Sequence, residues 1–254
     1  MYIKKILLIS VILFYLTSCK NSSTENQHLD KEYSYEVKII DEFPSPGPGP
    51  NALTYNSDYL WISDSIDAKI YKLDVTNREI IKEFAIQSSN INGITLKDNY
   101  LWYTDNDSIM LYKIDTNSEL IIEEIDLRSE VFVPILPKSV SGLTFDGVNL
   151  YCIFGKLGWS SQIVRFNTTM DSTFFFAFVS SNAGDITYDG EFFWICWDKN
   201  YVEQIDHQGL PAKSFIAPGV RTTGITYDES YFWIADDSLD YIYKIELQKV
   251  YIQD

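Results

Sequence analysis

Four aspartates recur at related positions along the chain and could carry chemistry. Asp64, Asp105 and Asp236 each stand three residues after a tryptophan. Asp198 directly follows Trp197, which holds the same position in a related segment. Carboxylates gathered around one axis could bind Ca²⁺, which takes six to eight oxygen ligands, or act as general acids and bases. The alternative is that each carboxylate accepts hydrogen bonds from its own turn, and repetition in several segments favours that structural role.

A second set of residues suits ligand binding rather than catalysis. Trp159 lies among small polar residues in a loop after Gly155, and with Trp197 it would form a stacking platform for a sugar ring or a peptide side chain. The alternative is that Trp159 folds back over the edge of a sheet. Lys138 and Arg221 lie in proline-containing connections that are expected at the same end of the fold as these two tryptophans. Each cation would suit an anionic group of a ligand there, or would simply be solvated.

Other catalytic constellations are excluded by residue counts. The chain has only two histidines, His28 and His207, so neither a histidine-based triad nor a zinc cluster can be assembled. Cys152 lies one residue after Tyr151, and Cys196 lies two residues after Trp194, the matching aromatic residue of the next repeat, so the two side chains should point to opposite faces of their sheets. This predicts buried free thiols, and a disulfide between them is the alternative. We therefore assign no catalytic residue from the sequence.

The elements that must position these residues are repeats. Five segments share the same nine-residue step from a small or polar residue to an aromatic anchor: Ala52–Trp61, Gly93–Trp102, Gly142–Tyr151, Asp185–Trp194 and Gly224–Trp233. The anchors recur after 41, 49, 43 and 39 residues. A period near 40 that contains several short strands is typical of a β-propeller blade.

Each repeat predicts four antiparallel strands, and the chain ends predict how the ring closes. The fifth repeat ends at Asp254 without a fourth strand, whereas the segment 35–43 precedes the first repeat and resembles the fourth strand at 80–86. The N-terminal strand would therefore complete the last blade and remove a free edge. The sequence predicts an all-β, five-bladed β-propeller of four-stranded antiparallel blades.

The N-terminus has the pattern of a targeting segment. Lys4 and Lys5 precede an apolar run of roughly a dozen residues, too short for a comfortable membrane span. The run ends in Leu16-Thr17-Ser18-Cys19, which resembles the bacterial lipobox. That resemblance implies a signal peptide at 1–18, lipidation of Cys19, a flexible tether over 19–32 and the propeller over 33–254. The expected location is the bacterial cell envelope, on an outer membrane.

Composition limits the class of partner. The chain has 254 residues and a formal net charge of −16, and such an acidic surface argues against nucleic acid as a partner. Aromatic residues make up 15% of the chain, which suits wide seams between blades filled by bulky rings.

The Gly-Ile-Thr-Tyr-Asp pattern that runs into Phe-Trp-Ile-x-Asp, followed by Tyr-Lys-Ile-Asp, resembles NHL-type and streptogramin-lyase-like propeller repeats. Five blades are also the architecture of the plant and bacterial glutaminyl cyclase family. These likenesses concern residues that build blades, so they imply a fold and do not select an activity.

The sequence thus favours a lipid-anchored, non-catalytic binding or scaffold module for a glycan, peptide or protein partner. The site is expected at the channel mouth around Trp159, Trp197, Arg221 and Lys138, and Ca²⁺ is the one cofactor left open. The alternatives are a propeller enzyme (a lyase, a hydrolase or a glutaminyl-cyclase-like transferase, with or without a metal) and a purely structural acidic spacer.

Overall fold

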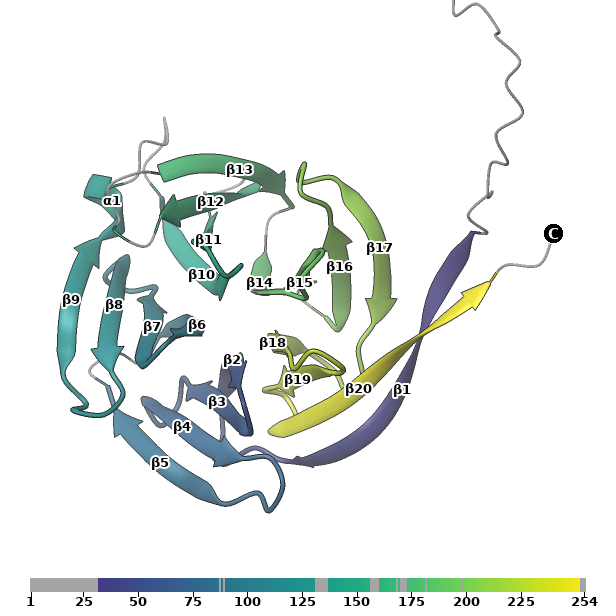
Figure 1. Ribbon diagram of the computed structural model, residues 1–254, viewed down its shortest axis with the longest axis horizontal. Coiled ribbons are helices and arrows are strands. Elements are labelled where there is room, and N and C mark those ends of the chain that lie inside the picture. Colours follow the sequence, from purple (N-terminus) through teal and green to yellow (C-terminus); the bar gives the residue numbers. More distant parts are fainter. Residues whose placement is uncertain are drawn as a thin grey trace, which may run out of the picture. The chain divides into compact units, whose positions relative to one another are not determined.

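The computed structural model describes residues 32–251, apart from residues 87, 89, 131–136, 156–159, 168, 170–172, 181 and 198. Twenty strands form five four-stranded antiparallel sheets arranged around a central axis (Figure 1). The one helix in this part of the chain, α1 (Leu127–Glu130), spans four residues, and no helix of the described residues is long and apolar enough to span a bilayer.

The first two blades follow one another along the chain, each running from the axis outward. Blade 1 consists of β2 (Pro50–Asn56), β3 (Tyr59–Asp64), β4 (Lys69–Asp74) and β5 (Ile80–Ala85). Blade 2 consists of β6 (Ile91–Lys97), β7 (Tyr100–Asp105), β8 (Met110–Asp115) and β9 (Ile121–Asp126). In both blades the second strand, β3 or β7, is almost fully buried and the outermost strand is largely exposed.

The next blades repeat this order. Blade 3 consists of β10 (Ser139–Phe145), β11 (Asn149–Gly155), β12 (Ser161–Asn167) and β13 (Thr173–Val179). Blade 4 consists of β14 (Ala183–Tyr188), β15 (Phe193–Trp197), β16 (Tyr201–Ile205) and β17 (Pro211–Ile216). Blade 5 takes β18 (Thr222–Tyr227), β19 (Phe232–Asp236) and β20 (Tyr241–Tyr251) from the C-terminal part of the chain.

The fourth strand of blade 5 is β1 (Tyr33–Pro44), from the other end of the chain. It pairs antiparallel with β20, with Val37 opposite Leu247 and Ile39 opposite Ile245. Figure 1 shows the long β1 and β20 ribbons crossing side by side at the outside of the ring. The expected closure of the ring by its two ends is confirmed, and pairing along the whole length of β1 covers the edge of β20.

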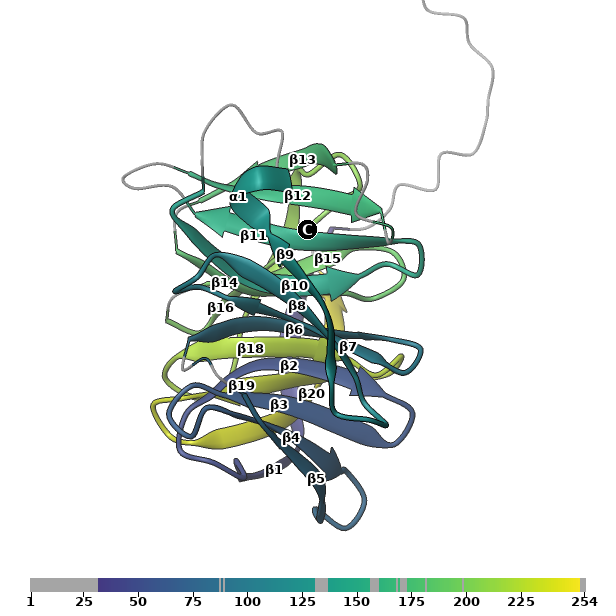
Figure 2. The ribbon, with the colours of Figure 1, turned by 90° about the vertical axis from the view of Figure 1, so that its left-hand side faces the viewer.

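The core consists of five apolar clusters, one in each seam between adjacent blades. Figure 2 shows the blades from the side, and each cluster joins residues of two adjacent blades. In the seam between blades 4 and 5, for example, Trp194 lies 5.0 Å from Phe232 and 5.6 Å from Phe215, measured between ring centroids. The aromatic residues that the sequence contains in excess are therefore structural at these positions.

Three aromatic anchors are also fixed by a side-chain hydrogen bond to a carboxylate, and in one of them the Tyr151 hydroxyl donates to Asp146 Oδ2 at 2.8 Å. The Nε1 atoms of Trp194 and Trp233 donate to the Asp189 and Asp228 carboxylates at 2.6 and 2.8 Å. Each of these aspartates also accepts backbone N–H bonds within the turn that joins the first two strands of its blade. One carboxylate thus fixes both the turn and the anchor, which explains why the Asp of this segment recurs five residues before the anchor.

Candidate functional site

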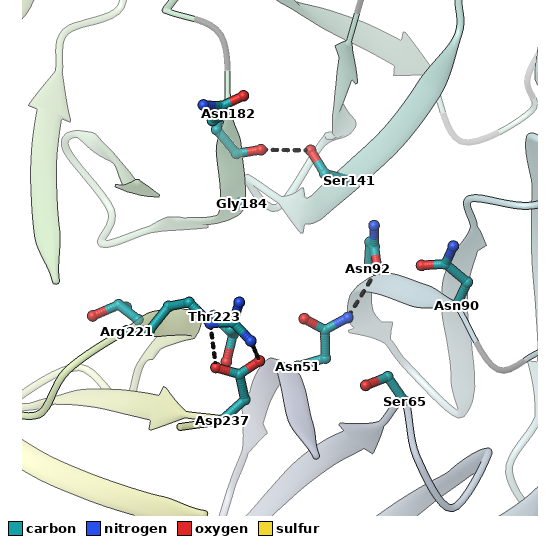
Figure 3. A pocket seen from close by; sticks show the side chains of 12 residues that line it. Asn51, Ser65, Asn90, Asn92, Ser141, Asn182, Gly184, Arg221, Thr223 and Asp237 are labelled. Carbon is teal, nitrogen blue, oxygen red and sulfur yellow. Dashed lines mark hydrogen bonds and ion pairs between the residues drawn. The ribbon is translucent and has the colours of Figure 1, made fainter. Parts of the chain in front are cut away.

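A cavity of about 410 Å³ lies at one mouth of the central channel, and residues of all five blades line it. Amide and hydroxyl side chains dominate its wall: Asn51, Ser65, Asn90, Asn92, Ser141, Asn182, Thr222 and Thr223. Figure 3 shows these side chains around an open centre, with the Arg221 and Asp237 pair on one side. The cavity at this mouth therefore offers many uncharged hydrogen-bond donors and acceptors to a ligand, and it contains one ion pair.

Several of these side chains form a belt of hydrogen bonds from blade to blade. Asn51 Nδ2 donates to Ile91 O at 2.6 Å and Asn92 Nδ2 to Val140 O at 3.4 Å. The belt goes on with donations from Ser141 Oγ to Ala183 O at 3.0 Å and from Thr223 Oγ1 to Pro50 O at 2.7 Å. Each donor lies one residue before the repeat's first position, and each acceptor lies two residues before it in the next blade. The innermost strands are thus tied to one another at the rim.

The charged residues of the cavity are paired. The Arg221 guanidinium forms a bidentate contact with the Asp237 carboxylate, whose first bond, from Nε to Oδ1, is 2.6 Å long. The Arg221 side chain is half exposed, whereas the Asp237 side chain is 17% exposed. Bidentate geometry holds the guanidinium plane in one orientation at the rim. Arg221, expected from the sequence to reach the mouth, does so.

Asp185 lies beneath the cavity and is fully buried. Its Oδ2 atom accepts hydrogen bonds from Leu53 N at 3.2 Å and Ile225 N at 3.1 Å, so one carboxyl group links the innermost strands of blades 4, 1 and 5. Its Oδ1 atom is buried and has no hydrogen-bond partner among the described residues. Burial raises the pKa of Asp185 well above its ordinary value, although backbone N–H groups act in the opposite direction.

The recurrent aspartates at the ends of the second strands contact their own connections. Asp64 accepts N–H bonds from Gly49, Ile66 and Asp67, at 2.7 to 2.9 Å. Asp236 accepts bonds from the turns on both sides in the same manner, and Asp105 accepts from Asp107 N and Ser108 Oγ.

A Cβ atom at Gly47 or Gly219 would lie within 2.2 Å of the Asp64 or Asp236 carboxylate, so glycine permits these approaches. Of the two roles left open by the sequence, these contacts favour the turn-fixing one. The described residues contain no cluster of three or more His, Cys, Asp or Glu side chains that could hold a metal ion, and Asp198 lies outside them.

Of the remaining ligand-binding candidates, neither Trp197 nor Lys138 lines the cavity. Trp197 is 7% exposed and packs in the seam between blades 3 and 4, which favours a role in the core for its ring. Lys138 is exposed and does not line the cavity, whereas Trp159 lies outside the described residues. Cys152 and Cys196 are buried free thiols, as expected.

Sequence reasoning missed the polar belt and Asp185, although a signal for both was present. The residue before the repeat's first position is Asn, Asn, Ser, Gly and Thr in the five repeats, so a donor recurs in four of them. The first position itself is small in four repeats and Asp185 in the fourth. A polar side chain next to the axis at a strand start points to the channel mouth, and these two columns carry that signal.

The arrangement suits recognition of uncharged polar groups. Asparagine amides both donate and accept, and so do serine and threonine hydroxyls, which matches ligands whose groups also do both. Within the described wall of the cavity, the titratable side chains are Arg221 and Asp237, which neutralise each other.

Comparison with known proteins supports the fold. No protein-family model matches the chain, and no curated protein matches its sequence. A glutaminyl cyclase from Myxococcus xanthus superposes with a TM-score of 0.67 at 11% identity, over 86% of this chain and 99% of that one. Regucalcin from Agrobacterium tumefaciens, a calcium-binding protein, gives 0.54 at 14% identity, over 86% and 97%.

The propeller domain of Cps50 (Swd1) from Myceliophteria thermophila gives a TM-score of 0.52 at 8% identity, over 84% of this chain and all of that domain. Identities this low show similarity of fold alone, because one fold can carry unrelated functions. The expected five-bladed architecture, with the glutaminyl cyclase as a structural relative, is confirmed at the level of the fold.

Proposed function

We propose that this protein is a lipid-anchored binding module of the bacterial envelope, and that it takes a glycan at the mouth of its channel. The observation that carries the proposal is the cavity of about 410 Å³, lined from all five blades by amides and hydroxyls. Pockets of this size hold small ligands or the end of a larger one. Non-catalytic binding fits a wall whose polar side chains are mostly neutral and partly committed to the inter-blade belt.

A glycan fits this wall better than a peptide does. Sugar hydroxyls donate and accept at once, as the Asn, Ser and Thr side chains of the cavity do. The paired Arg221 and Asp237 add a fixed donor face and a fixed acceptor face at the rim, which can bind neighbouring hydroxyls of one ring. A peptide backbone offers separate donors and acceptors in a fixed order, so it would use fewer of these groups.

The test is binding of the folded domain (residues 32–254) to a glycan array, with a peptide array in parallel. The Asn90→Ala variant removes a cavity amide that does not take part in the belt, and glycan binding should fall about fivefold to tenfold because the proposed site includes this amide. The matched control is Asn56→Ala, an exposed amide at the opposite end of β2. Binding to peptides alone, or equal glycan binding by wild type and N90A, would refute the proposal.

Anchoring is proposed on the lipobox pattern that ends at Cys19. In cells of a Gram-negative bacterium, the full chain should incorporate labelled palmitate and fractionate with the outer membrane. Cys19→Ala should abolish the label and release the protein from the membrane fraction, because the thiol is the acylation site. Retention of C19A in the membrane fraction would contradict the proposed anchor.

A further inference from the structure

The inter-blade belt is incomplete at one seam. In four repeats the residue before the first position bridges to the next blade, and the acceptor is always the carbonyl two residues before that blade's first position. In blade 4 the bridging position is Gly184, which has no side chain. The corresponding carbonyl in blade 5 belongs to Thr222. The seam between blades 4 and 5 therefore lacks the donor that every other seam has.

The nearest substitute for this donor is weak. Cys196 Sγ lies 3.6 Å from Thr223 O, one residue beyond the carbonyl that the belt uses elsewhere. A thiol is a poor hydrogen-bond donor. This sulfur also accepts a bond from Asp185 N at 3.0 Å. Cys196 therefore supports the backbone behind the gap and leaves the gap itself open to the cavity, whose wall includes Gly184, Thr222 and Thr223.

A second, independent feature lies at the same seam. Thr222 is 3% exposed, and its Oγ1 is buried without a hydrogen-bond partner among the described residues. Leaving a buried hydroxyl unpaired costs free energy, so such groups are rare in folded proteins unless a ligand or a water completes them. The unpaired hydroxyl and the missing donor both belong to the wall of one cavity.

We propose that the seam at Gly184 and Thr222 is the primary subsite of the cavity, and that it takes a hydroxyl group of the ligand. The ligand hydroxyl would stand where the side chain of residue 184 is missing, donate to the Thr222 carbonyl and pair with Thr222 Oγ1. The neighbouring seams show the geometry, since the hydroxyls of Ser141 and Thr223 make the equivalent bridges. This inference rests on the proposed glycan-binding function and specifies where the sugar binds.

A hydroxyl suits this space better than a carboxamide. A Cβ atom at Gly184 would lie 3.1 Å from Cys196 Sγ, a tight contact, 3.4 Å from Cys196 O and 3.8 Å from Thr223 O, so the space beside the backbone is narrow and suits no more than a small group. The bridges on either side of it, from Ser141 and Thr223, are also made by hydroxyls, whereas the Asn51 and Asn92 carboxamides act at the seams farther round the ring.

Three variants of the folded domain test the subsite, with D-glucose, D-galactose and propionamide as probes in ligand-observed NMR titrations. G184S supplies the missing hydroxyl and should weaken sugar binding more than tenfold, because the protein then fills its own gap. T222V removes the unpaired hydroxyl at nearly constant volume and should weaken sugar binding about fivefold to tenfold. T226V is the matched control, since Thr226 is a buried threonine of the same strand that lines the opposite mouth.

The possible results distinguish a failure of the proposed subsite from a failure of the proposed glycan-binding function. If the wild type binds a sugar, T226V binds it equally, and both G184S and T222V lose affinity while melting within a few degrees of the wild type, the subsite is supported. If the wild type binds a sugar but G184S and T222V bind it with unchanged affinity, the subsite is wrong and the glycan-binding function stands. If propionamide binds and is lost in G184S while neither sugar binds, the hydroxyl assignment and the glycan are both wrong. Absence of binding to all three probes would overturn both proposals.

Discussion

Asp185→Asn should reveal a carboxyl group that stays protonated in the folded protein at a pH where it is ionised in the unfolded chain. Asp185 is fully buried, and this burial outweighs the backbone N–H groups that favour its charged form, so its pKa lies well above the ordinary 3.8. Above pH 4 the folded state therefore binds one more proton than the unfolded state does at this position. The free energy of unfolding must then fall as the pH rises, until the folded-state pKa is passed.

The magnitude follows from proton linkage. One proton taken up on folding changes the free energy of unfolding by about 1.4 kcal/mol per pH unit. The D185N variant keeps an oxygen for the Leu53 and Ile225 N–H groups but has no proton to exchange. The stability of the wild type minus that of D185N should therefore fall with rising pH above pH 4.5, by up to about 1.4 kcal/mol per pH unit as long as the pH stays below the folded-state pKa of Asp185, and the contributions of the other carboxylates cancel in this difference.

Urea unfolding followed by tryptophan fluorescence at half-unit steps from pH 4.5 to 7.5 measures this difference. Glu191→Gln, which removes an exposed carboxylate from the same blade, controls for the loss of one negative charge. A difference that is flat with pH, or that rises with pH, would refute the reasoning. It would mean that the N–H groups around Asp185 stabilise its charged form by more than burial destabilises it.

Three further predictions concern the scaffold. Asp64→Ala should lower the free energy of unfolding by about 2–4 kcal/mol, because it leaves three backbone N–H groups without their acceptor, and chemical denaturation measures the loss. Asp228→Ala should cost about 1–3 kcal/mol, since the Trp233 ring and its turn both lose an acceptor, and a red shift of tryptophan emission in the native state should accompany it. Burial raises the pKa of the Cys152 and Cys196 thiols, so a thiol reagent added to the folded domain should modify neither until urea unfolds it; rapid native labelling would contradict their burial.

The fold was predictable because each repeat contains the same short sequence pattern. The nine-residue step to an aromatic anchor sets the length of the first hairpin, and the Asp that recurs five residues before the anchor fixes both that turn and the ring. The incomplete last repeat and the spare strand at 35–43 then leave one way to close the ring, which the pairing of β1 with β20 realises. These features are local or set by chain length, so a single sequence suffices to find them.

The site was harder to predict because it depends on distances across the axis. Arg221 was correctly placed at the mouth, since it lies in the connection that leads into an innermost strand. Trp197 was expected near the ligand, but its alternation in β15 directs the ring into the seam between blades 3 and 4. The belt partners Asn51 and Ile91 lie 40 residues apart, and only the closed ring brings one blade's side chain to the next blade's carbonyl.

The asymmetry of blade 4 has one origin in the sequence. The other repeats place a polar residue and then a small one at the strand start, whereas blade 4 has Gly184 followed by Asp185. Exchanging these two types moves the polar group from the rim, where it would bridge to blade 5, into the axis, where it bonds to blades 1 and 5 beneath the cavity. The same exchange removes the side-chain donor that would otherwise bond to the Thr222 carbonyl. The axial tie through Asp185 therefore compensates for the missing bridge in holding blades 4 and 5 together. G184S and D185N should therefore show coupled effects on stability, because the bridge supplied by G184S would offset part of the loss caused by D185N. Strictly additive free energies in a double-mutant cycle would contradict this compensation.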